Sequence, residues 1–189
     1  MREPILEPLL RRLRIKKVLP IIKQYYNCSL LDIGCGRDAK LLKTVEPYIS
    51  SGIGIDFKVQ EMSESNGGKI KTMSTILEKT LPFENNSFDI VTMLAVLEHL
   101  EHPIEIVKEI HRVLMPKGLL LLTVPSVWSQ PVLEFLSFKL GIVNRDEIAD
   151  HKLYYNRLLL QFLAQKTDFE MIKHEYFQLY MNNFCIFRK

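Results

Sequence analysis

The fold of this chain is decided by the stretch Leu30-Leu31-Asp32-Ile33-Gly34-Cys35-Gly36-Arg37-Asp38. An apolar strand enters a turn through Gly34 and Gly36, and a helical stretch leaves it. Glycine permits the tight bend and lets a ligand approach the backbone, because no Cβ stands in the way. The N-terminus of the following helix directs free N–H groups and the positive end of its dipole at such a ligand. The stretch therefore predicts a strand–turn–helix unit at a binding site.

A second acidic position follows the next apolar strand, which ends at Asp56. A carboxylate at this point accepts hydrogen bonds from both hydroxyl groups of an adenosine ribose. The spacing Gly34-x-Gly36-x-x-Ala39 also satisfies the loose dinucleotide fingerprint. A tight turn without a ligand, with Asp56 as a solvated loop residue, is the third interpretation that these residues leave open.

Apolar strands alternate with helical stretches along the rest of the chain. We expect strands at residues 29–33, 52–56, 71–77, 88–94 and 118–124. We expect helices at residues 5–26, 38–45, 103–114 and 154–165, with Pro20 breaking or kinking the first of them. This alternation predicts an α/β fold with a doubly wound, mostly parallel, Rossmann-like sheet. The tail, residues 170–187, predicts a C-terminal antiparallel hairpin that turns around residues 180–183.

Length and composition favour a single domain over residues 1–189. Hydrophobic residues make up 47% of the chain and charged residues 25%, which allows a buried core without disulfides or metals. Within this domain we expect an N-terminal helical segment at residues 1–28. We also expect an insertion at residues 126–150, after the C-terminal end of a strand, where ligands bind in such sheets.

Charge and cysteine content indicate where in the cell the protein is expected and which partners it is expected to have. The three cysteines have neither the number nor the spacing of a disulfide framework or a zinc site. Basic residues interrupt the N-terminal apolar stretch, and the longest apolar run is too short to span a bilayer. We therefore expect a cytoplasmic protein. The net charge of +3 does not indicate a nucleic-acid partner.

Three stretches carry a family resemblance. Asp32–Gly36 has an acid two residues before its first glycine, where dinucleotide folds usually carry an apolar residue. The other two are residues 81–91, LPFENNSFDIV, and residues 96–119, which begin VLEHL and end RVLMPKGL. In this order the chain resembles the class I S-adenosylmethionine-dependent methyltransferases, particularly the type 11-like group that methylates small molecules. The resemblance covers residues 30–125 and implies S-adenosylmethionine as the cofactor.

The resemblance also implies which residues hold the cofactor. Gly34 and Gly36 would line its methionine portion, Asp32 would support their loop, and Asp56 would hold the ribose. Two departures are Asp38, where many members have a third glycine, and Leu77, near the position of an aspartate that often contacts the adenine. Adenine recognition would then fall to backbone groups and to apolar packing by Phe57 and Leu77. The remaining cofactor candidates are Phe57, Leu77, Leu94 and Ala95.

The sequence indicates catalytic residues less clearly than cofactor-binding residues. A methyl group on a sulfonium is already electrophilic, so the reaction needs few catalytic side chains. The enzyme mainly has to position the acceptor in line with the methyl group and to exclude water. His99 is the candidate general base, needed only if the acceptor loses a proton, and it serves equally well as a residue that orders its loop. The neighbouring acids and histidines, Glu98 to His102, lack an HExxH pattern and are interpreted as a polar helix start and not as a metal site.

The acceptor is expected to be a small molecule, either free or linked to a lipid or sugar. His151 and Trp128 are the candidates for its binding side. The basic N-terminal helix can contact an anionic membrane surface or present a solvated face. A nicotinamide-dependent oxidoreductase and a non-catalytic binding module are the alternatives. Methylation of nucleic acid is disfavoured, because the Asn/Asp-Pro-Pro-Tyr/Phe motif that grips a flipped base is absent from the sequence.

Overall fold

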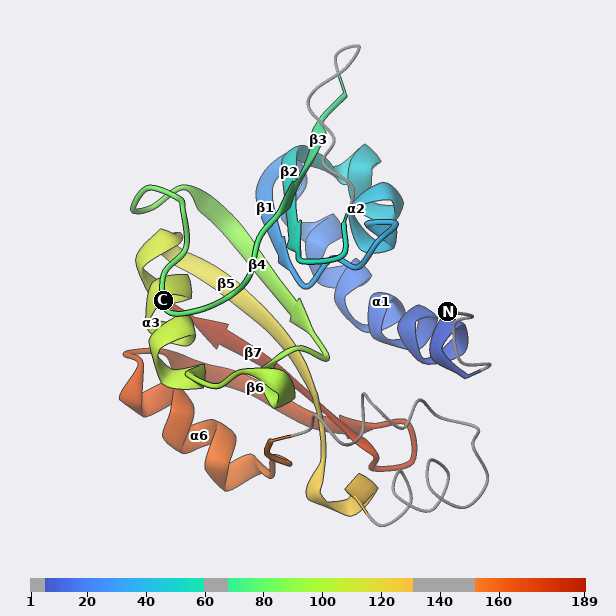
Figure 1. Ribbon diagram of the computed structural model, residues 1–189, viewed down its shortest axis with the longest axis vertical. Coiled ribbons are helices and arrows are strands. Elements are labelled where there is room, and N and C mark those ends of the chain that lie inside the picture. The colour runs from blue at the N-terminus through green and yellow to red at the C-terminus, as the bar shows by residue number, and fades with distance from the viewer. Residues whose placement is uncertain (1–5, 60–67, 131–151) are drawn as a thin grey trace.

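The structure, a computed structural model, describes residues 6–59, 68–130 and 152–189 (Figure 1). Its centre is one seven-stranded sheet with the strand order β3-β2-β1-β4-β5-β7-β6. The strands are β1 (Cys28–Ile33), β2 (Ile49–Asp56), β3 (Ile70–Ser74), β4 (Phe88–Leu94), β5 (Leu114–Pro125), β6 (Glu170–Phe177) and β7 (Asn182–Arg188). β1 to β5 run parallel, and β7 runs antiparallel to both β5 and β6. The expected mostly parallel sheet with a C-terminal antiparallel hairpin is confirmed.

Helices cover both faces of this sheet (Figure 1). The described helices are α1 (Glu7–Gln24), α2 (Lys40–Val45), α3 (Pro103–Val113) and α6 (Arg157–Lys166), with short 3-10 turns at η1 (Glu46–Tyr48), η2 (Leu97–His99) and η3 (Val127–Ser129). In the central strands Leu30 and Ile90 pack toward α1 and α2, whereas Leu31 and Val91 pack toward α3 and α6. Because successive side chains point to opposite faces and both faces are covered, these strands are continuous apolar runs.

α1 does not end at Pro20. The expected break is wrong, because the helix is continuous from Glu7 to Gln24. A proline inside a helix removes one backbone hydrogen bond, here the one to the carbonyl of Lys16. Val18 and Ile22, which lie on either side of Pro20 in α1, are fully buried. Burying two such side chains contributes roughly 1.5–3 kcal/mol each, which offsets the loss of that bond.

Several element boundaries differ from the expected ones for local reasons. α6 begins at Arg157 and not at residue 154, because the Asn156 side chain caps it by accepting from the Leu159 N–H at 2.9 Å. α2 begins at Lys40, because Ala39 has a left-handed backbone conformation. The hairpin turn lies just before the expected position, at residues 178–181. Residues 131–150 of the expected insertion lie outside the described residues.

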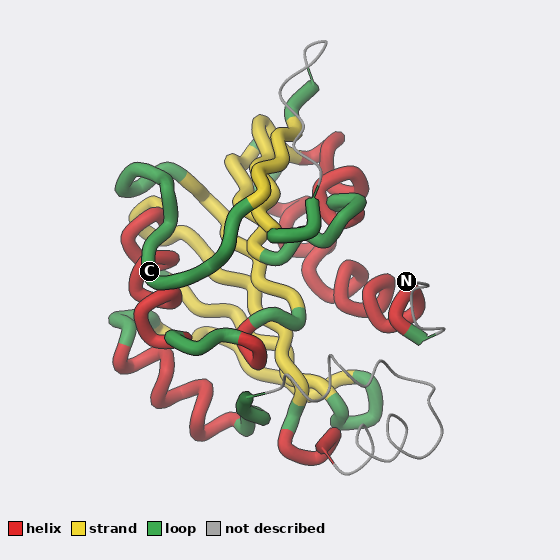
Figure 2. The backbone as a smooth tube through the Cα atoms, in the orientation of Figure 1, coloured by secondary structure: helices red, strands yellow, loops and turns green. Residues whose placement is uncertain are grey.

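The connection from β3 to β4 is loop throughout and is held by one side chain of α3 (Figure 2). The Arg112 guanidinium donates to the carbonyl oxygens of Phe83 at 2.8 Å and Leu81 at 3.0 Å, and to Asn85 Oδ1 at 2.9 Å. Glu109 orients the guanidinium by accepting two hydrogen bonds, at 2.9 and 2.7 Å. The arginine therefore replaces a crossover helix as the anchor of this connection.

We expect Arg112→Met to lower the free energy of unfolding by about 1–3 kcal/mol, because it leaves several loop acceptors without their charged donor. Urea denaturation followed by circular dichroism measures this change. Lys108→Met is the matched control, since Lys108 lies exposed on the same helix. Equal losses in the two variants would contradict the anchoring role.

Candidate functional site

The glycine loop is joined to the end of β2 by backbone hydrogen bonds. The N–H groups of Gly34 and Cys35 both donate to the carbonyl oxygen of Ile55, at 2.8 and 3.2 Å. Gly34 and Gly36 have φ values of +75° and +68°, which lie in the left-handed region that favours glycine. The loop therefore takes a defined path at the C-terminal edge of the sheet.

The two glycines are needed for different reasons. A Cβ on Gly34 would lie 2.2 Å from the Cγ2 atom of Val96, so the loop and the segment after β4 pack in direct contact. A Cβ on Gly36 would have no non-neighbouring heavy atom within 4 Å. Space is therefore open above Gly36 at the edge of the sheet where ligands bind in this architecture.

Asp56 stands beside this space at the end of β2. Its Oδ2 atom accepts a hydrogen bond from the Gly36 N–H at 3.0 Å, and its Oδ1 atom accepts one from the Lys58 N–H at 2.8 Å. The carboxylate thus holds the glycine loop in place. Each of its oxygens keeps a further lone pair for a ligand hydroxyl group.

Asp32 lies beneath the loop as a buried acid. Its carboxyl group is 3% exposed and accepts a hydrogen bond from the Thr92 hydroxyl at 2.7 Å. Burial raises the pKa of Asp32 to about 7, against the lowering effect of Thr92, and the charge of Asp56 adds to the rise. Strand pairing of β1 with β4 brings Asp32 and Thr92 together, which the sequence alone did not indicate.

The segment after β4 forms the second wall of the site. Leu94 and Ala95 are half-buried at the strand end, and the Ala95 N–H donates to the carbonyl oxygen of Thr123 at 2.9 Å. Ala95 has a φ of +59°, so the chain turns sharply there before η2. η2 then carries Glu98 and His99 across the end of the sheet.

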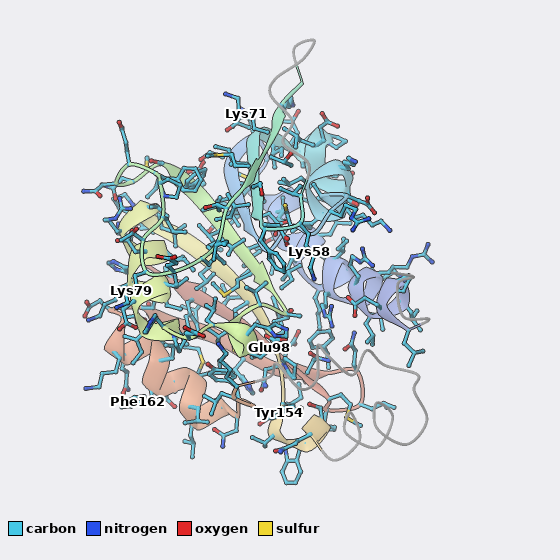
Figure 3. All side chains as sticks on the ribbon, in the orientation of Figure 1. Lys58, Lys71, Lys79, Glu98, Tyr154 and Phe162 are labelled. Carbon is cyan, nitrogen blue, oxygen red and sulfur yellow. The ribbon has the colours of Figure 1, made fainter. Side chains whose placement is uncertain are left out.

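Glu98 departs from its expected place in a polar helix start. It is 1% exposed, and its position near the end of β4 is labelled in Figure 3. Burial raises its pKa to about 7, while the charges of His99 and Arg14 act against the rise. Burial and the Glu98 charge also raise the pKa of Tyr155. The sequence offered little indication that Glu98 is buried, because a glutamate in a polar stretch can be either buried or exposed.

The other candidates are more scattered. His99 is half-buried beside Glu98, whereas Phe57 is 63% exposed after β2 and Leu77 packs partly against the α3 side of the core. Trp128 lies in η3 after β5 and is 65% exposed. His151 lies outside the described residues. Across the described part of the chain, no group of three or more histidine, cysteine or acidic side chains is arranged to hold a metal ion.

The raised pKa of Glu98 predicts a specific pH dependence of stability. A buried acid whose pKa is higher in the folded than in the unfolded protein favours folding only while protonated. Its contribution is therefore present below about pH 4.5 and is lost as the pH rises to about 7.

We expect the fall in unfolding free energy between pH 5 and 8 to be smaller in Glu98→Gln than in the wild type, by on the order of a few kcal/mol. Urea titrations at the two pH values measure it. Glu101→Gln, at a side chain that is 74% exposed, should leave the fall unchanged. A wild-type slope in Glu98→Gln would show that this carboxyl group is not buried.

The part of the chain that carries the glycine loop also resembles known proteins. Residues 31–122, from the glycine loop through β5, match the family described as "Methyltransferase domain". The demethylmenaquinone methyltransferase of Staphylococcus saprophyticus is 30% identical over 124 residues, covering 62% of this chain and 53% of the relative. An uncharacterised transposon protein of Streptomyces fradiae is 28% identical over 144 residues, covering 72% and 41%. The chain thus spans about half the length of the curated relatives it matches.

Solved structures share the fold over nearly the whole chain. A putative methyltransferase of Haloferax volcanii, solved with the Trm112 methyltransferase activator, superposes with a TM-score of 0.70 at 11% identity, covering 100% of this chain and 99% of that one. An S-adenosylmethionine-dependent methyltransferase of Archaeoglobus fulgidus gives a TM-score of 0.67 at 18% identity, covering 95% and 93%. The sheet order, the glycine loop and the methyltransferase domain matched over residues 31–122 agree with one another and support a class I S-adenosylmethionine-dependent methyltransferase.

Proposed function

We propose that this protein transfers the methyl group of S-adenosylmethionine to a small-molecule acceptor. The observation that carries the proposal is the open space above Gly36, bordered by the Asp56 carboxylate at the C-terminal edge of β1 and β2. Space of this kind beside a left-handed glycine allows a ligand to contact the backbone directly. The matched methyltransferase domain spans this part of the chain.

The residues around the space fit the donor. Gly34 and Gly36 would line its methionine portion, above the buried Asp32. Asp56 would accept hydrogen bonds from the ribose hydroxyls through its remaining lone pairs. Leu94–Ala95 would form an apolar wall beside the reacting methyl group.

Adenine recognition would depend on apolar side chains after β2 and β3. Phe57 directly follows Asp56 and exposes 63% of its surface, so its ring is accessible to a base beside the ribose. Leu77 packs against the core, so only part of its side chain would be accessible to the base.

The donor supplies a methyl group on a sulfonium, which needs no activation by the protein. The acceptor's nucleophilic atom bonds to the methyl carbon while the carbon–sulfur bond breaks, and its electron pair stays on sulfur. The protein has to align the acceptor and exclude water. His99 would take a proton from an acceptor that carries one.

A lipid-linked acceptor is the specific form of this proposal. The relative from Staphylococcus saprophyticus is named as a demethylmenaquinone methyltransferase. Trp128 in η3 and Leu153 before α6 are apolar and 65% and 46% exposed, so both side chains are accessible to an apolar acceptor. Together with His151 they are the candidates for the acceptor side.

Peripheral membrane contact would deliver such an acceptor. The outward face of α1 exposes Arg12, Lys16 and Lys23 together with Leu9. No acidic residue occurs between residues 8 and 31, so an anionic lipid surface would meet little repulsion. Within the described ranges, no helix is long and apolar enough to cross a membrane.

S-adenosylhomocysteine should raise the melting temperature in a concentration-dependent way, because a ligand of the folded state stabilises it. Thermal shift with this product, with S-adenosylmethionine and with NAD tests the proposal. Stabilisation by NAD alone would favour the nicotinamide-dependent oxidoreductase instead.

Asp56→Ala should weaken S-adenosylhomocysteine binding by about 1.5–3 kcal/mol, the range for hydrogen bonds to a charged group. Isothermal calorimetry measures the affinity. Asp38→Ala removes an exposed acid near the same loop and should change little. Unchanged affinity in Asp56→Ala would mean that the ribose binds elsewhere.

His99→Gln should leave donor affinity nearly intact and lower turnover by roughly 10²–10⁴-fold if His99 is the general base. Where the acceptor is not in hand, an NMR titration of the imidazole with S-adenosylhomocysteine is the substitute. A His99 resonance indifferent to the ligand would remove it from the methyl-transfer centre.

A further inference from the structure

The turn between β6 and β7 holds apolar side chains away from the protein. Its residues Gln178, Leu179 and Tyr180 have φ values of +52°, +56° and +67°, all in the left-handed region. Bulky residues are rarely found there, and such strain persists only where the surrounding structure enforces it, often at binding sites. Leu179 is 90% exposed and Tyr180 is 66% exposed. The turn therefore keeps a leucine in solvent at a cost in backbone energy.

Side-chain contacts fix this turn against α1 (Figure 1). The Gln178 amide group donates to the carbonyl oxygen of Leu10 at 3.4 Å, although the two residues are 168 positions apart in the chain. The Lys17 ammonium group donates to the Glu175 carboxylate near the end of β6, and it lies 5.8 Å from the centre of the Phe177 ring. The helix and the hairpin therefore form one surface.

A groove of about 320 Å³ lies between α1 and the hairpin. Lys17 is already paired with Glu175, so the exposed Lys16 is the cation that a ligand would meet there. The volume is at the lower end of the range for small-molecule sites, which suits a single anionic headgroup. Two of the described lining residues are basic and none is acidic: Leu13, Lys16 and Lys17 of the helix, and Phe177 and Gln178 of the hairpin.

The outward face of α1 continues this surface toward the start of the helix. Leu9 precedes Leu13 by four residues and Lys16 by seven, so the three side chains share one helix face. Leu9 is 53% exposed. Exposed leucines of the helix and of the turn thus accompany the basic groove. Proteins that bind membrane surfaces combine apolar side chains, which enter the boundary of headgroups and acyl chains, with basic ones, which attract anionic lipids.

The same turn is bonded to the end of β5, where the candidate acceptor side begins. The Ser126 N–H donates to the carbonyl oxygen of Met181 at 3.0 Å, and the Ser126 hydroxyl donates to that of Tyr180 at 2.5 Å. Trp128 follows two residues later in η3 and is 65% exposed. A partner that covers the turn would therefore lie beside residues proposed for the acceptor.

We propose that α1 and the β6–β7 turn together form a docking surface for an anionic lipid bilayer, with Leu9 and Leu179 entering the headgroup region and a lipid phosphate group bound at Lys16 in the groove. The inference rests on the proposed membrane contact of α1 and adds the hairpin and the groove to it. The left-handed turn presents Leu179 before binding, so little ordering cost is incurred when the bilayer is met.

Co-sedimentation of the full chain with lipid vesicles tests the docking surface. One set of vesicles contains phosphatidylcholine alone, and the other is an equimolar mixture of phosphatidylcholine and phosphatidylglycerol. The wild type should bind the anionic vesicles more strongly, and high salt should remove most of this preference, because salt screens exposed charges.

Leu179→Ser should lower the partition coefficient on anionic vesicles roughly 10-fold, because it removes the inserted side chain. Leu179→Phe, which keeps a large apolar group, should retain binding. Lys16→Gln should lower the coefficient roughly 5-fold, the effect of one basic residue at an anionic surface. The matched controls are Leu158→Ser, at a leucine of α6 that is 74% exposed, and Lys108→Gln on α3. Both lie on helices that cover the opposite face of the sheet and should bind like the wild type.

Separate outcomes would overturn separate parts of the inference. Wild-type binding by Leu179→Ser would exclude the hairpin and leave contact through α1 alone. Equal binding of the wild type to both kinds of vesicle would exclude a phosphate group at Lys16. Binding to neither would remove the proposed membrane contact together with the docking surface. Calorimetry with S-adenosylhomocysteine on the same variants should show unchanged affinity, so the proposed methyl donor is tested independently and loss of fold is detected.

Discussion

The site depends on the hydrogen bonds that join the glycine loop to the end of β2. Two backbone N–H groups share the carbonyl oxygen of Ile55, and the Gly36 N–H is held by the Asp56 carboxylate. These bonds place the loop beside the acid that would bind a ribose. They form only because β1 and β2 are parallel neighbours whose C-terminal ends meet at one edge.

Burial of acids on this edge gives the site its electrostatic character. Asp32 and Glu98 are almost completely enclosed, and burial raises the pKa of each to about 7. Asp32 has Thr92 as its partner, whereas one oxygen of Glu98 has none among the described residues. An enclosed, incompletely satisfied carboxyl group costs stability.

The helices differ in how well their sequences predict them. α3 follows its apolar periodicity from Pro103 almost to the expected end. α1 passes through Pro20, because packing on the sheet outweighs one missing hydrogen bond. The loop between β3 and β4 is held by Arg112, a residue of a helix that comes later in the chain. Local pattern is informative where local bonds dominate and fails where a distant side chain supplies the hydrogen bonds.

The sequence by itself determined the α/β architecture, the position of the glycine turn and the position of Asp56 at the end of the next strand. These are local features, because they depend on strand and helix periodicity, on glycines in a turn and on an acid that follows a strand. Only the tertiary structure decided that Asp32 pairs with Thr92, that Val96 packs on Gly34 and that Glu98 is buried near Arg14. Each of these contacts joins segments far apart in the chain. Their chemistry depends on burial and on neighbours across the sheet edge, which residue order does not encode in any local pattern.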